Sequence, residues 1–248
     1  SGDQLIVAGR SYSLREVDKV WVVGGGKASS AMAASLFDLL SERITGGIVV
    51  TKYGHTGPGL DTGPVEVIEA GHPVPDEAGV RGARRLVDLV EGASDRDLVL
   101  VVLSGGGSPL LTLPAPGLSL LDLQETTQLL LRSGASIVEL NAVRKHLSHI
   151  KGGRLARRIA PARAICLVLS DVVSDPLDVI ASGPTYPDPT TYQDAWDVLG
   201  RYDLANRVPA KVREHLEAGL VGTRSDTPKP GDALFQSVQH VIVGSNRL

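Results

Sequence analysis

The sequence predicts an α/β fold, a Rossmann-like three-layer sandwich built around a mostly parallel sheet. Two observations carry this prediction. Short apolar runs rich in β-branched residues recur along the chain, and segments with helical periodicity alternate with them. Most of these runs are almost continuously apolar, which is typical of parallel strands that helices cover on both faces. We therefore expect helices packed on a mostly parallel sheet.

The individual elements follow in chain order. The predicted strands are KVWVV (19–23), GGIVV (46–50), VEVIEA (65–70), LVLVVL (98–103), AICLVL (164–169) and HVIVG (240–244). Helices are expected at 27–43, 76–92, 119–134, 191–202 and 209–218. Asp76 and Ser119 are predicted N-caps, because their side-chain oxygens can accept a backbone N–H. Gly134 is a predicted helix stop, because glycine adopts the left-handed conformation readily.

Composition excludes several classes of function. The chain has 248 residues, is 42% hydrophobic and carries a formal net charge of −3, so neither nucleic acid nor an anionic membrane is an expected partner. No apolar run approaches the roughly 20 residues needed to span a bilayer. The single cysteine, Cys166, lies inside an apolar run and suits a reducing compartment, so we expect a cytoplasmic protein.

Residues of unusual composition follow three of the predicted strands. They are GGGKASS (24–30), SGGGS (104–108) and SDVVSDPLDVIASGPTYPDPT (170–190). Ligands of open parallel sheets bind beyond the carboxyl ends of the strands. The sequence therefore predicts that these three loops share one edge of the sheet and one site.

The SGGGS loop is predicted to hold phosphate. Glycines after a strand let backbone N–H groups converge on an anion, and the flanking serines can add hydroxyl donors. The alternative is a tight turn packed against a neighbouring strand, and the pattern matches neither G-x-G-x-x-G nor a P-loop. The predicted phosphate-binding residues are Ser104, Gly105, Gly106, Gly107 and Ser108.

Lys27 in the first glycine loop is a second candidate for contact with a phosphate. We expect it in the first turn of a helix, where the helix dipole disfavours a cation. A bound polyanion would explain a lysine at such a position, and a solvated lysine is the alternative.

The stretch 141–158 is basic and contains no acidic residue. Arg144, Lys145 and Lys151 are predicted to contact a phosphate or a carboxylate, since arginine suits bidentate binding and lysine supplies a point charge. A solvated helix face is favoured for Arg157 and Arg158. No aromatic residues are interleaved for base stacking, which argues against nucleic acid.

Carboxylates of the third loop suggest Mg²⁺ beside a phosphate. Asp171 directly follows a predicted strand, and it could hold the metal with Asp175 or accept a proton from a substrate hydroxyl. For Asp178 and Asp188, capping of the loop by Asx turns is at least as good an interpretation. Ser182 and Gly183 form a further candidate anion loop. His72 could contact a ligand, although a structural role in its turn is slightly favoured.

A set of motifs occurs along the chain in a characteristic order. It comprises GGGKA, EAGHPVPDE, LSGGGSPLL, SGASIVELNAVRKHLSHIKGGRLA, LSDVVSDP and IASGPTYPDPTT. With these motifs the chain closely resembles the class II glycerate kinases, the glycerate 2-kinase family whose C-terminal part carries the MOFRL motif. The resemblance covers residues 19–248. It implies ATP- and Mg²⁺-dependent phosphorylation of D-glycerate, commonly to 2-phosphoglycerate, in a cleft between two α/β domains.

The resemblance also assigns residues. The catalytic lysine of the family matches Lys27, and Asn141 joins the expected substrate-binding set. A second important basic residue, an arginine, belongs to the family's C-terminal portion. We therefore expect residues 1–248 to be the N-terminal α/β domain without its MOFRL-containing partner, and to be inactive alone. The family's SDVPGD-like sequence reads SDVVSDP here; Asp171 and Asp175 are kept, but the loop can differ.

Other functions remain open at this point. A hydroxypyruvate reductase would need a nicotinamide site, and neither glycine loop matches G-x-G-x-x-G. A non-catalytic module that binds phosphate or a nucleotide is a different class of protein with the same loops. The expected partners are the small molecules D-glycerate and ATP, and a homodimer is one option for the assembly.

Overall fold

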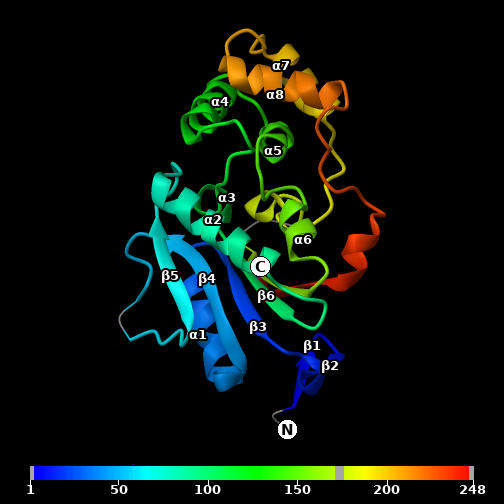
Figure 1. Ribbon diagram of the computed structural model, residues 1–248. Helices are drawn as coiled ribbons and strands as arrows, with labels where there is room; N and C mark the ends of the chain where they lie inside the picture. The colour runs from blue at the N-terminus through cyan, green and yellow to red at the C-terminus, as the bar shows by residue number, and fades with distance from the viewer. Residues whose placement is uncertain (1–2, 58, 171–175, 246–248) are drawn as a thin grey trace.

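A six-stranded parallel sheet forms the centre of the computed structural model (Figure 1), which describes residues 3–57, 59–170 and 176–245. The strand order is β5-β4-β3-β6-β7-β8, and every neighbouring pair is parallel. The predicted Rossmann-like α/β sandwich is thus confirmed. The strands are β3 (Val20–Gly25), β4 (Ile44–Lys52), β5 (Val65–Ala70), β6 (Leu98–Ser104), β7 (Arg163–Ser170) and β8 (Val238–Ser245).

This order contains a topological switch point between β3 and β6. The chain runs outward from β3 to β5, then returns to the other side of β3 and runs outward again to β8. The loops that leave β3 and β6 therefore lie next to each other at the carboxyl edge of the sheet, at this switch point. In open α/β sheets this is the place where ligands bind.

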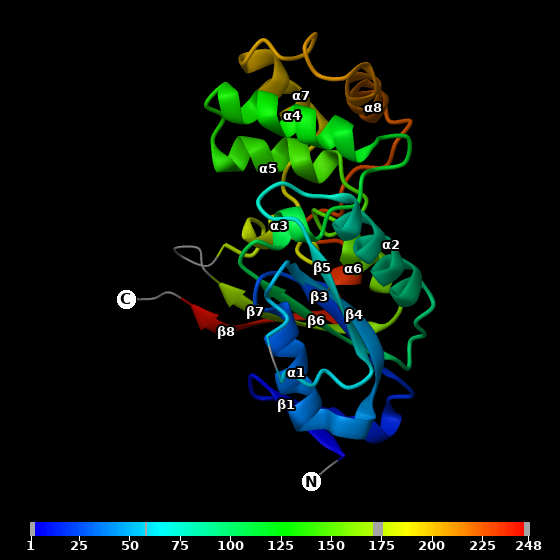
Figure 2. The same ribbon diagram turned by 90° about the vertical axis from the view of Figure 1, so that its left-hand side faces the viewer.

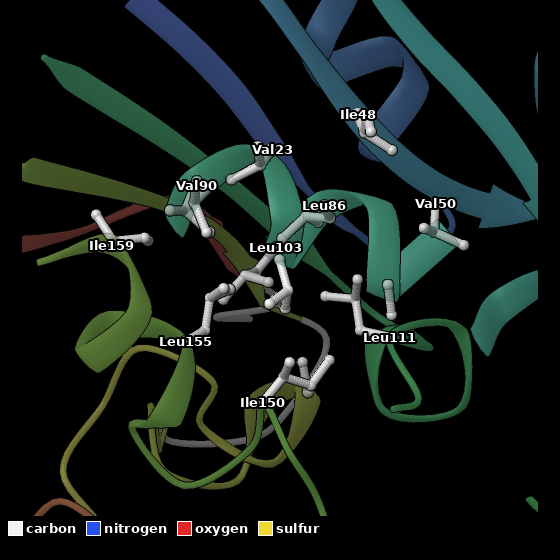
Figure 3. Packing of buried hydrophobic residues seen from close by; sticks show 14 of the residues in the cluster. Val23, Ile48, Val50, Leu86, Val90, Leu103, Leu111, Ile150, Leu155 and Ile159 are labelled. Atoms are coloured by element: carbon white, nitrogen blue, oxygen red, sulfur yellow. The ribbon is translucent and has the colours of Figure 1, made fainter. Parts of the chain in front are cut away.

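Helices cover both faces of the sheet. On one face α1 (Ser29–Leu40) packs on the strands together with a hairpin of β1 (Gln4–Val7) and β2 (Arg10–Ser13). On the other face lie α2 (Glu77–Glu91) and α6 (Arg154–Ile159). Figure 3 shows side chains of both helices packed with residues of β3 and β4 in one apolar cluster.

Helix α2 illustrates how the sequence produces this packing. The Asp76 side chain caps it as predicted, by accepting a hydrogen bond from Gly79 N at 3.0 Å. Leu86 and Val90 recur one turn apart, are fully buried and face the sheet. Burial of each such side chain stabilises the fold by about 1.5–3 kcal/mol. A Cβ at Gly82 would lie 2.8 Å from Val50, so the helix approaches β4 closely.

A further group of helices lies beyond the carboxyl edge of the sheet, apart from the helices that cover its two faces (Figure 2). We call it the helical lobe; it has its own apolar cluster, separate from those of the sheet. Its helices are α4 (Leu120–Arg132), α5 (Ile137–His146), α7 (Tyr192–Arg201) and α8 (Ala210–Leu220).

Capping boxes define where three of these helices begin. Their N-caps are Ser119, Ser136 and Thr191, each paired with an acidic residue three positions on. The predicted cap at Ser119 is confirmed, and Gly134 follows α4 with a φ of 77° as its predicted stop. The helices expected at 119–134, 191–202 and 209–218 are all present.

Short helical turns complete the described chain. They are η1 (Leu14–Glu16), η2 (Ser41–Arg43), α3 (Gly107–Leu110), η3 (Ile180–Ser182) and η4 (Ala233–Ser237). In the parts of the chain that the structure describes, every helix is too short or too polar to cross a membrane.

Candidate functional site

The two glycine loops at the switch point are joined to each other by hydrogen bonds. Ser104, at the end of β6, accepts a hydrogen bond on its Oγ from Ala28 N at 3.0 Å. Lys27 N donates to Gly105 O at 2.9 Å, and Gly26 N donates to Val50 O of β4 at 3.0 Å. The loops after β3 and β6 therefore form one unit at the edge of the sheet, as the sequence predicted.

Close approach of the protein's own chain accounts for several of the glycines. Gly26 has a φ of 140°, and a Cβ there would lie 2.2 Å from Ser104 Oγ. A Cβ at Gly107 would lie 2.8 Å from the Cβ of Ala181. A Cβ at Gly106 would meet the His72 ring at 2.9 Å. The packed-turn interpretation thus explains these positions, and phosphate binding by the loop stays a prediction.

Lys27 lies beside this unit as an exposed cation. Helix α1 begins at Ser29, so Lys27 precedes the first turn in which the sequence placed it. A Cβ at Gly106 would lie 3.3 Å from Lys27 Cε, which puts the lysine side chain over the second glycine loop. Among the described residues its ammonium has no ion-pair partner. A cation held in this way is available to an anion from solution.

A chain of polar side chains connects the second glycine loop to the third. Ser108 Oγ and Ser182 Oγ lie 2.9 Å apart, and Ser182 Oγ donates to Asn141 Oδ1 at 3.0 Å. Asn141 and Ser182 are buried, and Asn141 Nδ2 has no hydrogen-bond partner among the described residues. The structure thus brings together three residues that were predicted separately, and it leaves one buried donor for a further group.

The third loop holds an unusual backbone at this contact. Ala181, Ser182 and Gly183 all have positive φ values, of 51°, 62° and 59°. For residues other than glycine this conformation costs about 1–3 kcal/mol each and persists only where the surroundings enforce it. Gly152 N donates to Ser182 O at 3.1 Å, and Gly153 N donates to Gly183 O at 2.8 Å. The segment 151–154 (KGGR) therefore holds the turn at residues 181–183 in its strained conformation.

Lys145 is buried and already paired inside the protein. Its Nζ lies 3.2 Å from Asp188 Oδ1 and 3.7 Å from Asp178 Oδ2. Asp188 Oδ1 also accepts hydrogen bonds from Thr190 N at 3.0 Å and Thr190 Oγ1 at 2.8 Å, so the predicted Asx turn is confirmed. Most of the charge of Lys145 is compensated by this network, which ties α5 to the third loop.

Lys151 and Arg144 have no such carboxylates. Lys151 Nζ is buried and donates to Ser108 O at 2.6 Å and to Leu111 O at 2.7 Å. Burial, and secondly the charge of Arg144, lower the pKa of Lys151 to about 7. Burial also lowers the pKa of Arg144. Neither cation forms an ion pair with any carboxylate of residues 3–57, 59–170 and 176–245.

The predicted metal ligands, Asp171 and Asp175, lie outside the described residues. Within the described part of the chain, no three His, Cys, Asp or Glu side chains gather closely enough to hold a metal ion. Cys166 is buried in the middle of β7 with its pKa raised to about 12 by burial, as a structural cysteine.

Sequence reasoning missed several features of the site. It gave no sign that Asn141 and Ser182 meet, since 41 residues separate them. It favoured a structural role for His72, and the packing of that ring against Gly106 agrees with such a role, but the sequence did not place the ring near Lys27. A histidine between a strand end and a proline was the only signal for this position.

The site therefore belongs to an α/β protein with a cationic, glycine-lined edge at its switch point. Comparison with known proteins gives the family. The model described as "Domain of unknown function (DUF4147)" matches residues 2–217, so the chain belongs to the DUF4147 family.

Named relatives give the context of this family. The chain is 44% identical over 248 residues to a protein of Pyrococcus horikoshii named glycerate 2-kinase, covering all of this chain and 54% of that protein. It is 51% identical over 188 residues to a protein of Thermotoga maritima named D-glycerate 2-kinase. That match covers 76% of this chain and 45% of the Thermotoga protein. A relative from Agrobacterium vitis, 44% identical over 232 residues, is named putative hydroxypyruvate reductase; the match covers 94% of this chain and 51% of that protein. The chain spans about half the length of these relatives.

A crystal structure of a Pyrococcus horikoshii protein has the same fold. It superposes with a TM-score of 0.91 at 44% sequence identity, covering 99% of this chain and 54% of that one. The architecture at the carboxyl edge is thus shared with a larger protein.

Proposed function

We propose that this chain forms one half of an enzyme that transfers the γ-phosphoryl group of ATP to D-glycerate, giving 2-phosphoglycerate. The observation that carries the proposal is an exposed lysine, Lys27, over a pair of glycine loops at the switch point of the sheet. The names of the relatives from Pyrococcus and Thermotoga support the choice of glycerate.

The chemistry needs charge stabilisation more than covalent catalysis. The glycerate hydroxyl oxygen attacks the γ-phosphorus, the bond to ADP breaks, and negative charge spreads over the transferring oxygens. We assign the stabilisation of that charge to Lys27. Its side chain lies beside Gly106 and its ammonium forms no ion pair with a described carboxylate, which supports the assignment. Backbone N–H groups of the 104–108 loop would contact the phosphates.

Three further assignments complete the proposal. Asn141 Nδ2, the buried donor without a described partner, is the polar group that a bound hydroxy acid could satisfy beside Ser182 and Gly183. Asp171 is proposed to accept the hydroxyl proton or, with Asp175, to hold Mg²⁺, and this rests on the family resemblance. Mg²⁺ bound with ATP neutralises charge on the phosphate oxygens. Positive charge on Lys145 is proposed to position the third loop through Asp178 and Asp188.

The proposed whole enzyme is cytoplasmic, with its cleft between this chain and a second domain. A purified full-length protein is incubated with MgATP and D-glycerate, and phosphorus NMR follows the product. A new phosphomonoester signal split by a single proton is expected, because carbon 2 of glycerate carries one hydrogen. A signal split by two protons would show that carbon 3, which carries two hydrogens, is phosphorylated instead. No transfer by a folded protein would overturn the proposal.

Hydroxypyruvate reduction is the second candidate, favoured only by the name of the Agrobacterium relative. The same preparation is mixed with NADH and hydroxypyruvate. We expect no fall in NADH absorbance, because neither glycine loop has the dinucleotide fingerprint.

A further inference from the structure

A pocket of about 300 Å³ lies between the helical lobe and the sheet-bearing body. Residues of α3, α4 and α5 line it together with residues 73–75. Gln124 of α4 connects the lobe to this last segment, since its Nε2 donates to Pro75 O at 2.7 Å. A pocket of this volume suits a small organic molecule.

The walls of the pocket are mainly hydrocarbon. Leu123 and Leu130 line it from α4, while Val143 and Leu147 line it from α5 and its C-cap. The polar Thr126 of the same wall already donates its hydroxyl to Asp122 O at 2.7 Å. These walls favour an apolar body, because a hydroxyl buried against them would lose its hydrogen bonds to water.

Two basic side chains, Arg144 and Lys151, also line the pocket. Lys151 is buried and Arg144 is half-buried, and neither has a carboxylate partner among the described residues. The charge of Arg144 disfavours the protonated form of Lys151, so the two groups lie close enough to repel each other. A bound anion would offset this repulsion and favour the charged form of Lys151.

We propose that this pocket binds an organic monocarboxylate with an apolar body, its carboxylate between Arg144 and Lys151 and its hydrocarbon part against Leu123, Leu130 and Val143. Glycerate does not fit this description, because each of its carbons carries oxygen. ATP does not fit it either, because its several phosphate charges exceed those of two cations. The ligand is thus a second molecule, and the proposal stands whether or not glycerate is the phosphoryl acceptor.

Cyclohexanecarboxylate is the probe for this pocket. Its binding to the purified full-length protein is measured by calorimetry and compared with that of two molecules that each lack one feature. Cyclohexylmethanol keeps the ring without the charge, and acetate keeps the charge without the ring. We expect the dissociation constant of the probe to be at least ten-fold lower than that of either comparison molecule. Equal affinities for probe and alcohol, or for probe and acetate, would overturn the proposal.

Variants locate the binding within the molecule. Arg144→Gln is expected to raise the dissociation constant of the probe by ten-fold or more. Arg157 is an exposed arginine on α6, and Arg157→Gln is expected to leave that constant unchanged. Thr127→Phe, at the partly exposed wall of the pocket, should abolish binding by filling the space for the ring, and it keeps the test valid if Arg144→Gln fails to fold. If a folded Arg144→Gln or Thr127→Phe protein binds the probe as tightly as the wild type, the probe binds elsewhere and the proposal is contradicted.

Discussion

The two ends of strand β3 differ in how their polar groups are satisfied. At the amino end, Asp97 is buried and accepts hydrogen bonds from Ser94 N at 3.1 Å and from Trp21 Nε1 at 3.4 Å. The Lys19 ammonium lies 5.7 Å from the centre of the Trp21 ring. At the carboxyl end, Lys27 has no described ion pair, and Asn141 Nδ2 has no described partner.

The difference between the two ends of β3 distinguishes residues that stabilise the fold from residues that could bind a ligand. The described polar groups at the amino end stabilise one another. Groups at the carboxyl end are held by close packing and a strained turn, yet Lys27 has no ion pair and Asn141 Nδ2 no hydrogen-bond partner among the described residues. A parallel sheet places its binding residues at that edge. Glycines such as Gly26 and Gly107 let the loops there pack closely on neighbouring segments.

Gly26→Ala is expected to cause the largest loss of stability. Its Cβ would lie 2.2 Å from Ser104 Oγ and 2.6 Å from Ser104 O, at a φ of 140° that alanine rarely adopts. We expect the free energy of unfolding to fall by about 3 kcal/mol, and the two glycine loops to separate. Urea unfolding measures this change. Gly46→Ala is the control toward the amino end, where the Cβ would lie 3.2 Å from the Trp21 side chain and 3.8 Å from Pro64 O. An equal loss of stability there would contradict the comparison.

The buried Lys151 predicts a pH dependence of stability. Its folded pKa of about 7 lies below the usual value of 10.5, so between these pH values the unfolded chain binds more protons than the folded one. The free energy of unfolding therefore rises with pH in that window, by up to about 1.4 kcal/mol per pH unit. Urea unfolding of wild type and Lys151→Met at pH 7, 8 and 9 isolates the contribution. Parallel profiles would mean that the pKa of Lys151 is not lowered.

Asp97→Ala tests the amino end. The substitution removes the acceptor of two part-buried hydrogen bonds, from Trp21 Nε1 and from Ser94 N, so we expect a loss of about 1–3 kcal/mol in the free energy of unfolding. Activity per folded molecule is expected to stay unchanged, because the proposed site lies at the opposite end of the strand. Thermal melting and a transfer assay on the same sample measure both quantities. The exposed Asp95→Ala is the control and should change neither.

The sequence was sufficient to predict the six strands of the sheet, their mostly parallel arrangement and most of the helices, but not the order of the strands. Every residue of β6 is buried, and a continuous apolar run is the pattern that such a strand requires. Helices with strong caps, such as α2 and α4, were predicted with nearly correct bounds. The β1–β2 hairpin was not predicted, because its strands of four residues are short and its turn at Ala8 lacks the usual Asn or Asp.

The site was predicted only in outline. Strand–loop order placed the glycine loops at one edge, but it could not say which basic residue would be buried or paired. Lys145 meets Asp188 across 43 residues, and Lys151 meets carbonyl groups that any residue carries. These are consequences of tertiary packing, which a local pattern does not encode.

The central claim is that the exposed lysine beyond the carboxyl end of β3 stabilises a transferring phosphoryl group. It is tested most directly by kcat for transfer from MgATP to D-glycerate in full-length Lys27→Ala and Lys19→Ala proteins. Both substitutions remove an exposed lysine from an end of the same strand. We predict that Lys27→Ala lowers kcat by about 100-fold or more, and that Lys19→Ala leaves it unchanged. A Lys27→Ala enzyme that keeps the kcat of the wild type would contradict the account.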